Sequence, residues 1–402
     1  MSGTQHIGRS HQLTVTPIPT TRSPAVTRSP YGAGRTLQLE ILQACPDFPF
    51  SESDTVTALI TKLFPLTMSS VREVVIQTKS GAEFRAILKL YDRRFGLYHR
   101  QVMGELPHQG ENEGAFRSFV VVHCGEHEGA FQSFVQQGNM APFLQELEQD
   151  KKTSLIAVPA SHYYERTPEG HARYEAALWK ECIEHFECET EAYSRLSYVQ
   201  GTRIPRMYAH VRIAPANAFP DAPADLLSSP QTAPYFEVRG VLIELIDGYQ
   251  LWDIANALGA PSDPEAWPPI IQTASDAAHE INKRGIFMED CAPRNVVVDA
   301  RTQKPFIIDL AQCRFKDRMV EDWREMEWDD DDDWDPDVEY WEQMRQSKNP
   351  ADIGCVMGPR LRLEKGMELH GITFPDYDGI IEEIKRRKGL RAQSAGEQSL
   401  VE

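Results

Sequence analysis

The sequence predicts an α+β protein that is long enough for two lobes or two domains. Three observations favour this class. The chain has 402 residues, which is enough to bury two cores. Strand patterns at residues 71–79 and 84–91 precede the long helical pattern at residues 174–199. Finally, polar residues flank two short apolar strands between Phe287 and Leu310, which indicates a functional hairpin.

Composition excludes some partners. The net charge of −18 argues against a nucleic-acid surface, because such a surface needs clustered Lys and Arg to replace counterions. No apolar run approaches the roughly 20 residues that span a bilayer. We therefore expect neither a nucleic-acid nor a membrane partner. The seven cysteines form no C-x-x-C pair, which is typical of reduced thiols in a cytoplasmic or nuclear protein.

Both ends of the chain have the composition of disordered segments. The first 39 residues contain no acid and are rich in Ser, Thr, Pro and Arg, so residues 1–35 are expected to form a disordered basic arm, with a transit peptide as the alternative. Ser23 and Ser29 lie in Arg-Ser-Pro and are candidate phosphorylation sites; an unmodified arm is the other interpretation. Residues 389–402 are expected to form a disordered tail.

The first structured segment, residues 36–246, is expected to form the strand-containing lobe. Leu37–Ala44 and Asp54–Phe64 are interpreted as helices. Val71–Lys79 and Phe84–Tyr91 are predicted strands joined by a Gly81 turn.

Lys89 lies in the middle of the second predicted strand and shares one face with Ile87 and Tyr91. A lysine in this position either snorkels at a sheet edge or points at an anion. The composition of the strand leaves both interpretations open.

Residues 95–171 are predicted to be an insertion. They contain one internal repeat, in which Gly110–Val120 recurs as Gly125–Val135. Two copies are too few for a solenoid, so a local duplication that carries a pair of short helices is the preferred interpretation.

The segment after the insertion continues with helix and strand patterns. Tyr174–Val199 has an apolar stripe with many interleaved acids, typical of a long amphipathic helix. Most of these acids are expected to be solvated, and one of them can point inward. The following elements are a Pro/Ala/Ser-rich loop, an apolar strand and two helices, at Ala214–Pro234, Val238–Ile246, Leu251–Leu258 and Ile270–Lys283.

The hairpin at Phe287–Leu310 carries the chemistry. Asp290 is followed by Asn295, then by the β-branched strand Val296–Val298, a turn, and a second apolar strand that ends on Asp309. Residues that flank two adjacent strands converge at one end of a hairpin. Two acids and an amide gathered there can hold a divalent metal ion and accept a proton.

The second lobe, residues 247–388, ends in less regular sequence. An acidic, tryptophan-rich segment spans residues 318–345, and its five consecutive acids at Asp329–Asp333 are interpreted as a solvated loop, with a cation or basic partner as the alternative. Pro375–Lys388 is predicted to be a final amphipathic helix.

In this order, the motifs resemble those of the protein-kinase-like superfamily. The sequence is most similar to divergent members in filamentous fungi, and it also resembles aminoglycoside and choline kinases. The resemblance covers about residues 71–315 without the insertion. It implies a two-lobed kinase-like fold, with a small antiparallel-sheet N-lobe, a mainly helical C-lobe, and residues 95–171 inserted between the lysine strand and the N-lobe helix.

The resemblance also implies an ATP site. Ala86-Ile87-Leu88-Lys89 resembles the Val-Ala-Ile-Lys strand, so Lys89 would hold the α- and β-phosphates of ATP. Glu189 would be its partner on the helix, with Glu191 as the alternative. The hinge would bind adenine through the carbonyl of Glu244 and the N–H of Ile246, and Val297 would form the adenine floor.

The catalytic loop is matched in the same way. Asp290 would be the base or the orienting group for the attacking hydroxyl, and Asn295 and Asp309 would bind Mg²⁺. Arg294 resembles the arginine that lies near the γ-phosphate in tyrosine kinases. The position two residues after Asp290, a lysine in most serine/threonine kinases, is Ala292.

Several family features are missing. The sequence between Leu66 and Lys79 has no glycine-rich loop, and no Ala-Pro-Glu follows the hairpin. His-Arg-Asp is replaced by Met288-Glu289-Asp290, Asp-Phe-Gly by Asp309-Leu310-Ala311, and the usual alanine two residues before the lysine by Ile87. The sequence therefore predicts an ATP- and Mg²⁺-dependent phosphotransferase acting on a hydroxyl of a protein or small molecule. A pseudokinase that serves as a binding scaffold is the alternative.

Overall fold

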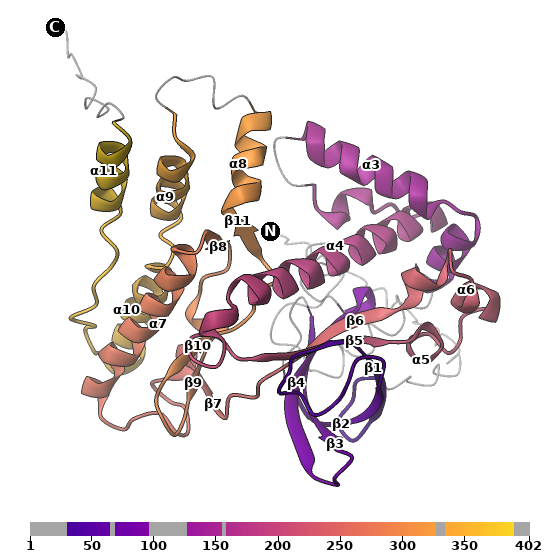
Figure 1. Cartoon of the computed structure of the whole chain (residues 1–402), viewed down its shortest axis with the longest axis horizontal. Helices are drawn as coiled ribbons and strands as arrows, with labels where there is room; N and C mark the ends of the chain where they lie inside the picture. The colour runs from indigo at the N-terminus through magenta and orange to yellow at the C-terminus, as the bar shows by residue number, and fades with distance from the viewer. Residues whose placement is uncertain (1–29, 65–68, 96–126, 155–157, 327–333, 390–402) are drawn as a thin grey trace, which may run out of the picture.

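The computed structural model describes residues 30–64, 69–95, 127–154, 158–326 and 334–389 (Figure 1). Predictions for Ser23 and Ser29, for the first copy of the repeat and for Asp329–Asp333 lie outside the described residues. Within the described part of the chain, no helix is both long enough and apolar enough to cross a membrane.

Six antiparallel strands from residues 36–243 form a closed barrel. Side chains on alternate positions of each strand point inward, so the barrel is filled by aliphatic residues such as Leu39, Ile60, Ile76 and Leu88. The barrel order is β1-β2-β3-β4-β6-β5, with β1 (Thr36–Ala44), β2 (Thr55–Leu63), β3 (Ser70–Gln77), β4 (Glu83–Tyr91), β5 (Met207–Ile213) and β6 (Val238–Ile243).

The predicted helices at Leu37–Ala44 and Asp54–Phe64 are wrong, because both segments are strands. In β1 and in β2, buried residues alternate with exposed ones along most of the strand, which is the period of a strand and not of a helix. Pairing decides the outcome, since β1 bonds to both β2 and β5 and so closes the barrel. The predicted strands at 71–79 and 84–91 are confirmed as β3 and β4.

The insertion packs on the barrel and shares its core. Phe131 and Phe143 are buried in the same cluster as the barrel residues Leu39 and Leu88. The second copy of the repeat folds as one helix over residues 127–136. The other elements of this region are α3 (Met140–Thr153) and the 3-10 helices η1 (Arg93–Phe95) and η2 (Ala160–Tyr163).

The long helix α4 (Pro168–Arg195) lies across the barrel and continues toward the second half of the molecule (Figure 1). It begins where the side chain of Thr167 accepts a hydrogen bond from the N–H of Gly170, an N-cap arrangement. The helix therefore starts before the predicted Tyr174. The predicted disordered arm also ends earlier than residue 35, because Tyr31 is buried in the core.

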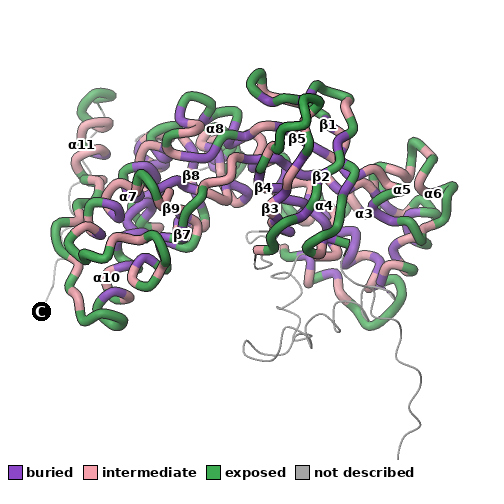
Figure 2. The backbone as a smooth tube through the Cα atoms, turned by 90° about the horizontal axis from the view of Figure 1, so that it is seen from below, coloured by how far each residue is buried: buried purple, intermediate pink, exposed green. Residues whose placement is uncertain are grey.

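The second half of the chain surrounds its own core, as the buried stretches in both halves of Figure 2 show. Helix α7 (Trp267–Asn282) confirms the predicted helix near Ile270–Lys283. Two small sheets flank it, in the orders β10-β9-β7 and β11-β8. Their strands are β7 (Gly248–Gln250), β8 (Ile286–Met288), β9 (Val296–Asp299), β10 (Pro305–Ile307) and β11 (Cys313–Phe315).

Two further sequence predictions need correction. Leu251–Leu258 is not a full helix, because only the 3-10 turn η5 (Leu251–Asp253) forms and Leu258 is exposed to solvent. The predicted loop at 214–234 contains the short helices α5 (Pro215–Ala218), α6 (Ala224–Ser228) and η4 (Ala233–Phe236).

A third, smaller core lies at the C-terminal end. Trp323, Tyr340, Met344 and Ile381 are buried together there. The tryptophans of the acidic segment therefore serve packing, at least in its described part. The helices that supply this core are α8 (Lys316–Glu325), α9 (Pro336–Gln346) and α11 (Tyr377–Lys388), while α10 (Asp352–Lys365) packs on the second core.

Candidate active site

Lys89 on β4 lies at the centre of a buried charged cluster. Its side chain is 6% exposed, and its Nζ lies 3.0 Å from a carboxylate oxygen of Glu189 and 2.7 Å from Oδ1 of Asp309. The neighbouring strand passes close behind it at Gly240, where a Cβ would stand 2.6 Å from the carbonyl oxygen of Lys89. The fold thus brings together three predicted site residues that are 100 and 220 positions apart in the chain.

The carboxylate of Glu189 is fully buried and accepts hydrogen bonds from three donors. Its donors are the ammonium group of Lys89, the hydroxyl of Tyr91 and the backbone N–H of Leu310, the last at 3.2 Å. A buried charge is tolerated when it is paired and hydrogen-bonded in this way. The alternative partner, Glu191, pairs instead with Arg195 and Arg318.

Asp309 follows β10 and has a backbone φ of 63°, in the left-handed region that non-glycine residues rarely adopt. Such a conformation costs about 1–3 kcal/mol and persists where the surroundings impose it. Here the ion pair with Lys89 holds the side chain of Asp309, and the hydrogen bond from the N–H of Leu310 to Glu189 holds the residue that follows. The strained backbone is one more reason to consider Asp309 a candidate site residue.

The cluster keeps its charges. Burial by itself lowers the pKa of Lys89, but the carboxylates of Asp309 and Glu189 outweigh burial and raise it. For Asp309 burial raises the pKa, and the nearby Lys89 ammonium reverses this and lowers it. Near neutral pH, Lys89 is a cation and Asp309 an anion, which suits a site for phosphates and a divalent metal ion.

Asp290, Arg294 and Asn295 form a second, more exposed group. They lie in and before the 3-10 helix η7 (Pro293–Asn295), which follows β8. The amide of Asn295 donates to Oδ2 of Asp290 at 2.8 Å, and Arg294 donates to Oδ1. The side chains of Asp290 and Arg294 are 30% and 60% exposed.

The strands β9 and β10 bring Asn295 and Asp309 to the same end of the hairpin. Val296 pairs with Ile307, and the N–H of Ile308 donates to the carbonyl of Asn295 at 2.9 Å. The described residues contain no group of three or more His, Cys, Asp or Glu that fits a metal ion. One carboxylate and one amide still suffice for Mg²⁺ bound with ATP, because phosphates and water complete its shell.

The predicted hinge follows β6. The side chain of Glu244 is held by Arg206, whose Nη1 lies 3.0 Å from Oε1, and it therefore points to β5. Among the described residues, neither the carbonyl of Glu244 nor the N–H of Ile246 takes part in a hydrogen bond, so both can bind a ligand. Val297 is half-buried and lies on the opposite face of β9 from Val298.

Sequence reasoning missed Tyr91 and Tyr193. Tyr91 lies two residues after Lys89, on the same strand face, so its spacing was the available signal. Tyr193 lies one helical turn after Glu189 and is buried, and its hydroxyl has no hydrogen-bond partner in the part of the chain that the structure describes. Burial and the charge of Glu189 raise the pKa of both phenols.

No protein-family model matches the sequence, and no curated protein matches it either.

Proposed function

We propose that the protein is an ATP- and Mg²⁺-dependent phosphotransferase that moves the γ-phosphate to a hydroxyl of a protein or a small molecule. The single observation that carries this proposal is the buried Lys89–Glu189–Asp309 cluster. It presents a fixed cation and a fixed carboxylate beside the hairpin end that holds Asn295. Phosphoryl transfer needs chiefly positioned phosphates, bridging metal ions and charge neutralisation.

Each residue then has a chemical role. Lys89, oriented by Glu189, neutralises the α- and β-phosphates, and Asp309 and Asn295 hold Mg²⁺. Asp290 orients the acceptor hydroxyl and takes its proton, and Arg294 adds positive charge near the γ-phosphate. The carbonyl of Glu244 and the N–H of Ile246 bind the adenine edge, against which Val297 packs.

A pseudokinase is the second candidate, and one observation favours it. The resemblance places the phosphate-binding loop in the connection between β2 and β3, and its residues 65–68 are Pro-Leu-Thr-Met, without glycine. A loop without glycine cannot bring its backbone N–H groups as close to phosphates. Under this alternative the fold binds a partner, and nucleotide turnover is absent.

Nucleotide binding is the first test. Mg²⁺–ATP at 100 times its dissociation constant should stabilise the full-length protein by about 2.7 kcal/mol, visible as a rise in Tm. The Asp309→Asn variant should lose this rise, and Asp276→Asn, which changes an exposed carboxylate on α7, should keep it. The absence of any Mg²⁺-dependent rise in the wild-type protein would sink the proposal.

Transfer of the γ-phosphate is the second test. The protein is incubated with γ-labelled ATP and with panels of protein and small-molecule alcohols, beside the Asp290→Asn variant. Labelled product that depends on Asp290 supports the transferase. Binding of Mg²⁺–ATP without any transfer supports the scaffold.

A further inference from the structure

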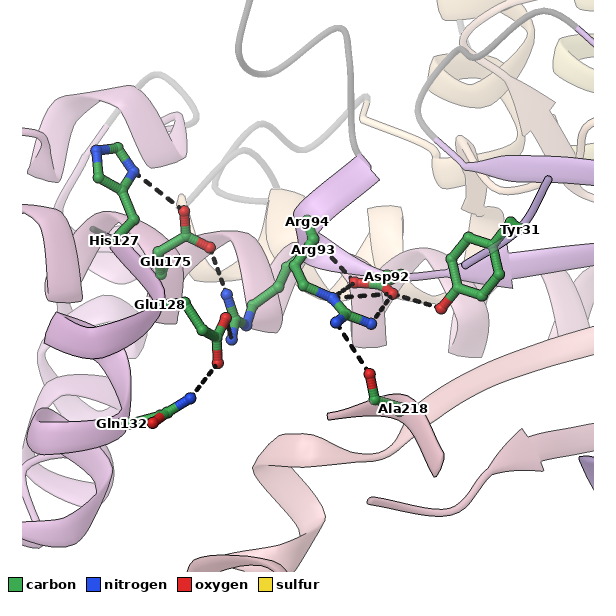
Figure 3. Close-up of polar contacts among 9 residues, drawn as sticks. All are labelled: Tyr31, Asp92, Arg93, Arg94, His127, Glu128, Gln132, Glu175 and Ala218. Atoms are coloured by element: carbon green, nitrogen blue, oxygen red, sulfur yellow. Dashed lines mark hydrogen bonds and ion pairs between the residues drawn. The ribbon is translucent and has the colours of Figure 1, made fainter. Parts of the chain in front are cut away.

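Arg93 lies four residues after Lys89 and belongs to a second buried cluster of charged side chains (Figure 3). Its side chain is 3% exposed, and its guanidinium lies 2.6 Å from Glu175 and 2.6 Å from Glu128. The guanidinium also stands over the ring of Phe131, with 3.9 Å to the centroid. A planar fork that contacts two carboxylates and an aromatic face is held more rigidly than a lysine would be.

The carboxylates of this cluster come from two different helices. Glu175 is on α4, the helix that also carries Glu189, and it is 1% exposed. Glu128 and Phe131 are on the helix of residues 127–136, inside the insertion. His127 at the start of that helix contacts Glu175 as well, with 3.3 Å between Nδ1 and Oε1.

The end of β4 is anchored independently of α4. Asp92 accepts hydrogen bonds from Arg94 and from the hydroxyl of Tyr31, and Arg94 donates to the carbonyl of Ala218 (Figure 3). The backbone that carries Arg93 is therefore fixed to the barrel and to α5. The ion pairs of Arg93 therefore fix the positions of Glu175 and Glu128, and of the helices that carry them, relative to the barrel.

Arg93 and Lys89 hold the same helix at two separate places. Fourteen residues separate Glu175 from Glu189, which is about 21 Å of helix and close to four full turns. Both carboxylates therefore project from nearly the same face of α4. A helix held at one point can swing about it, and a helix held at two distant points on one face has a defined axis.

We propose that Arg93 is a positioning residue for the Lys89–Glu189 pair, and that the insertion helix 127–136, through Glu128, is a working part of the nucleotide-binding half of the site. Arg93 fixes the axis of α4 so that Glu189 stays within reach of Lys89. The effect on catalysis rests on the proposed phosphotransferase function. The effect on the position of Glu189 does not.

The test compares variants of the full-length protein at a temperature well below their Tm. Arg93→Lys keeps the positive charge but loses the planar guanidinium that contacts two carboxylates. Glu175→Gln keeps the shape of the side chain but loses its negative charge. The matched control is Arg173→Lys, because Arg173 is on the same helix and pairs with Glu146 on α3, away from β4. Circular dichroism and gel filtration establish that each variant is folded.

The first readout needs no nucleotide. The rate at which an amine-reactive acylating reagent modifies Lys89 is measured by peptide mass spectrometry, with the 78%-exposed Lys79 as internal reference. Local opening of the Lys89–Glu189 pair should speed modification of Lys89 about tenfold in Arg93→Lys and in Glu175→Gln. The rates at Lys79, and both rates in Arg173→Lys, should stay at wild-type values.

Equal Lys89 rates in the wild type and in both folded variants would overturn the proposal. An equal acceleration at the half-buried Lys316, which is 28% exposed, would overturn it too, because that marks general loosening. If Arg93→Lys does not fold, Glu175→Gln and the milder Glu128→Gln decide the question.

The second readout separates this inference from the proposed function. In the phosphotransferase, Arg93→Lys should raise the KM for ATP and lower kcat, each about tenfold, and Arg173→Lys should change neither. If the wild-type protein neither binds nor turns over nucleotide, the proposed function fails, and the labelling result still decides the role of Arg93.

Discussion

The candidate site has a buried half and an exposed half, and they are held in different ways. In the buried half, the side chains of Lys89 and Glu189 are 6% and 0% exposed, and that of Asp309, at the edge of this half, is 24% exposed. In the exposed half, the Arg294–Asp290 pair is 60% and 30% exposed. Charges away from water interact strongly and must be fully paired, whereas water screens the others.

This difference in burial indicates what holds each half in place. The buried half is fixed by folding, because leaving any of its charges unpaired is costly. In the proposed phosphotransferase, the exposed half would reorient at small cost when substrate and metal ion bind. Substitutions in the buried half should therefore reduce the free energy of unfolding, and those in the exposed half should reduce only the proposed activity.

Removing the central carboxylate should have the largest effect on stability. Glu189→Ala removes one of the two carboxylates that pair with Lys89 and leaves the Tyr91 hydroxyl and the N–H of Leu310 without their acceptor, so we expect a loss of about 3–5 kcal/mol in the free energy of unfolding. Urea denaturation measures it. Glu191→Ala, at a half-buried carboxylate of the same helix that pairs with Arg195 and Arg318, should cost less than about 1 kcal/mol. Equal losses would contradict the buried–exposed division.

Asp309→Asn should come next, with a loss of about 2 kcal/mol at pH 7 because a charged partner of Lys89 becomes neutral. The loss should depend on pH. The folded-state pKa of Asp309 lies below its unfolded value near 4, so its contribution is complete above about pH 5 and disappears as pH falls through the folded pKa.

Urea denaturation of the wild type and Asp309→Asn at several pH values between 7 and 3 checks this. The two curves should converge in acid. A difference that stays constant down to pH 3 would mean that the charge of Asp309 contributes nothing to stability.

Tyr91→Phe should cost about 1.5 kcal/mol, because it removes a hydrogen bond to the buried charge of Glu189. Tyr193→Phe is the matched control, as both tyrosines are buried and lie near Glu189. The Tyr193 hydroxyl has no partner among the described residues, so its loss should cost less than about 0.5 kcal/mol. Thermal or urea unfolding of the two single variants measures the difference, and a larger effect from Tyr193→Phe would refute the assignment.

Asp290→Asn should change stability least. Its ion pair with Arg294 is at the surface, so the free energy of unfolding should move by less than about 0.5 kcal/mol. If the proposed phosphotransferase activity is correct, kcat should fall by about 10²-fold or more, because the acceptor hydroxyl loses its base. Steady-state kinetics beside urea denaturation tests the split, and Asp299→Asn on the far side of the same hairpin serves as the activity control.

The sequence by itself determined the local features of the site. The β-branched strand after Asn295 and the apolar strand before Asp309 predict β9 and β10, because adjacent short strands with a tight turn pair locally. Residue spacing places Asn295 and Asp309 at one end of that hairpin. The strand of Lys89 and the helix of Glu189 were also predicted from their own periodicity.

The tertiary structure decided everything that depends on long-range packing. Leu37–Ala44 and Asp54–Phe64 are strands although their local propensity is ambiguous, because the first pairs with β5 and the second pairs with β3. The tertiary structure also selected Glu189 over Glu191, because only Glu189 faces β4. It recruited Tyr91, and it placed Arg93 between Glu175 and Glu128. Burial of a charge requires partners from several segments at once, and no local pattern records which distant segments will supply them.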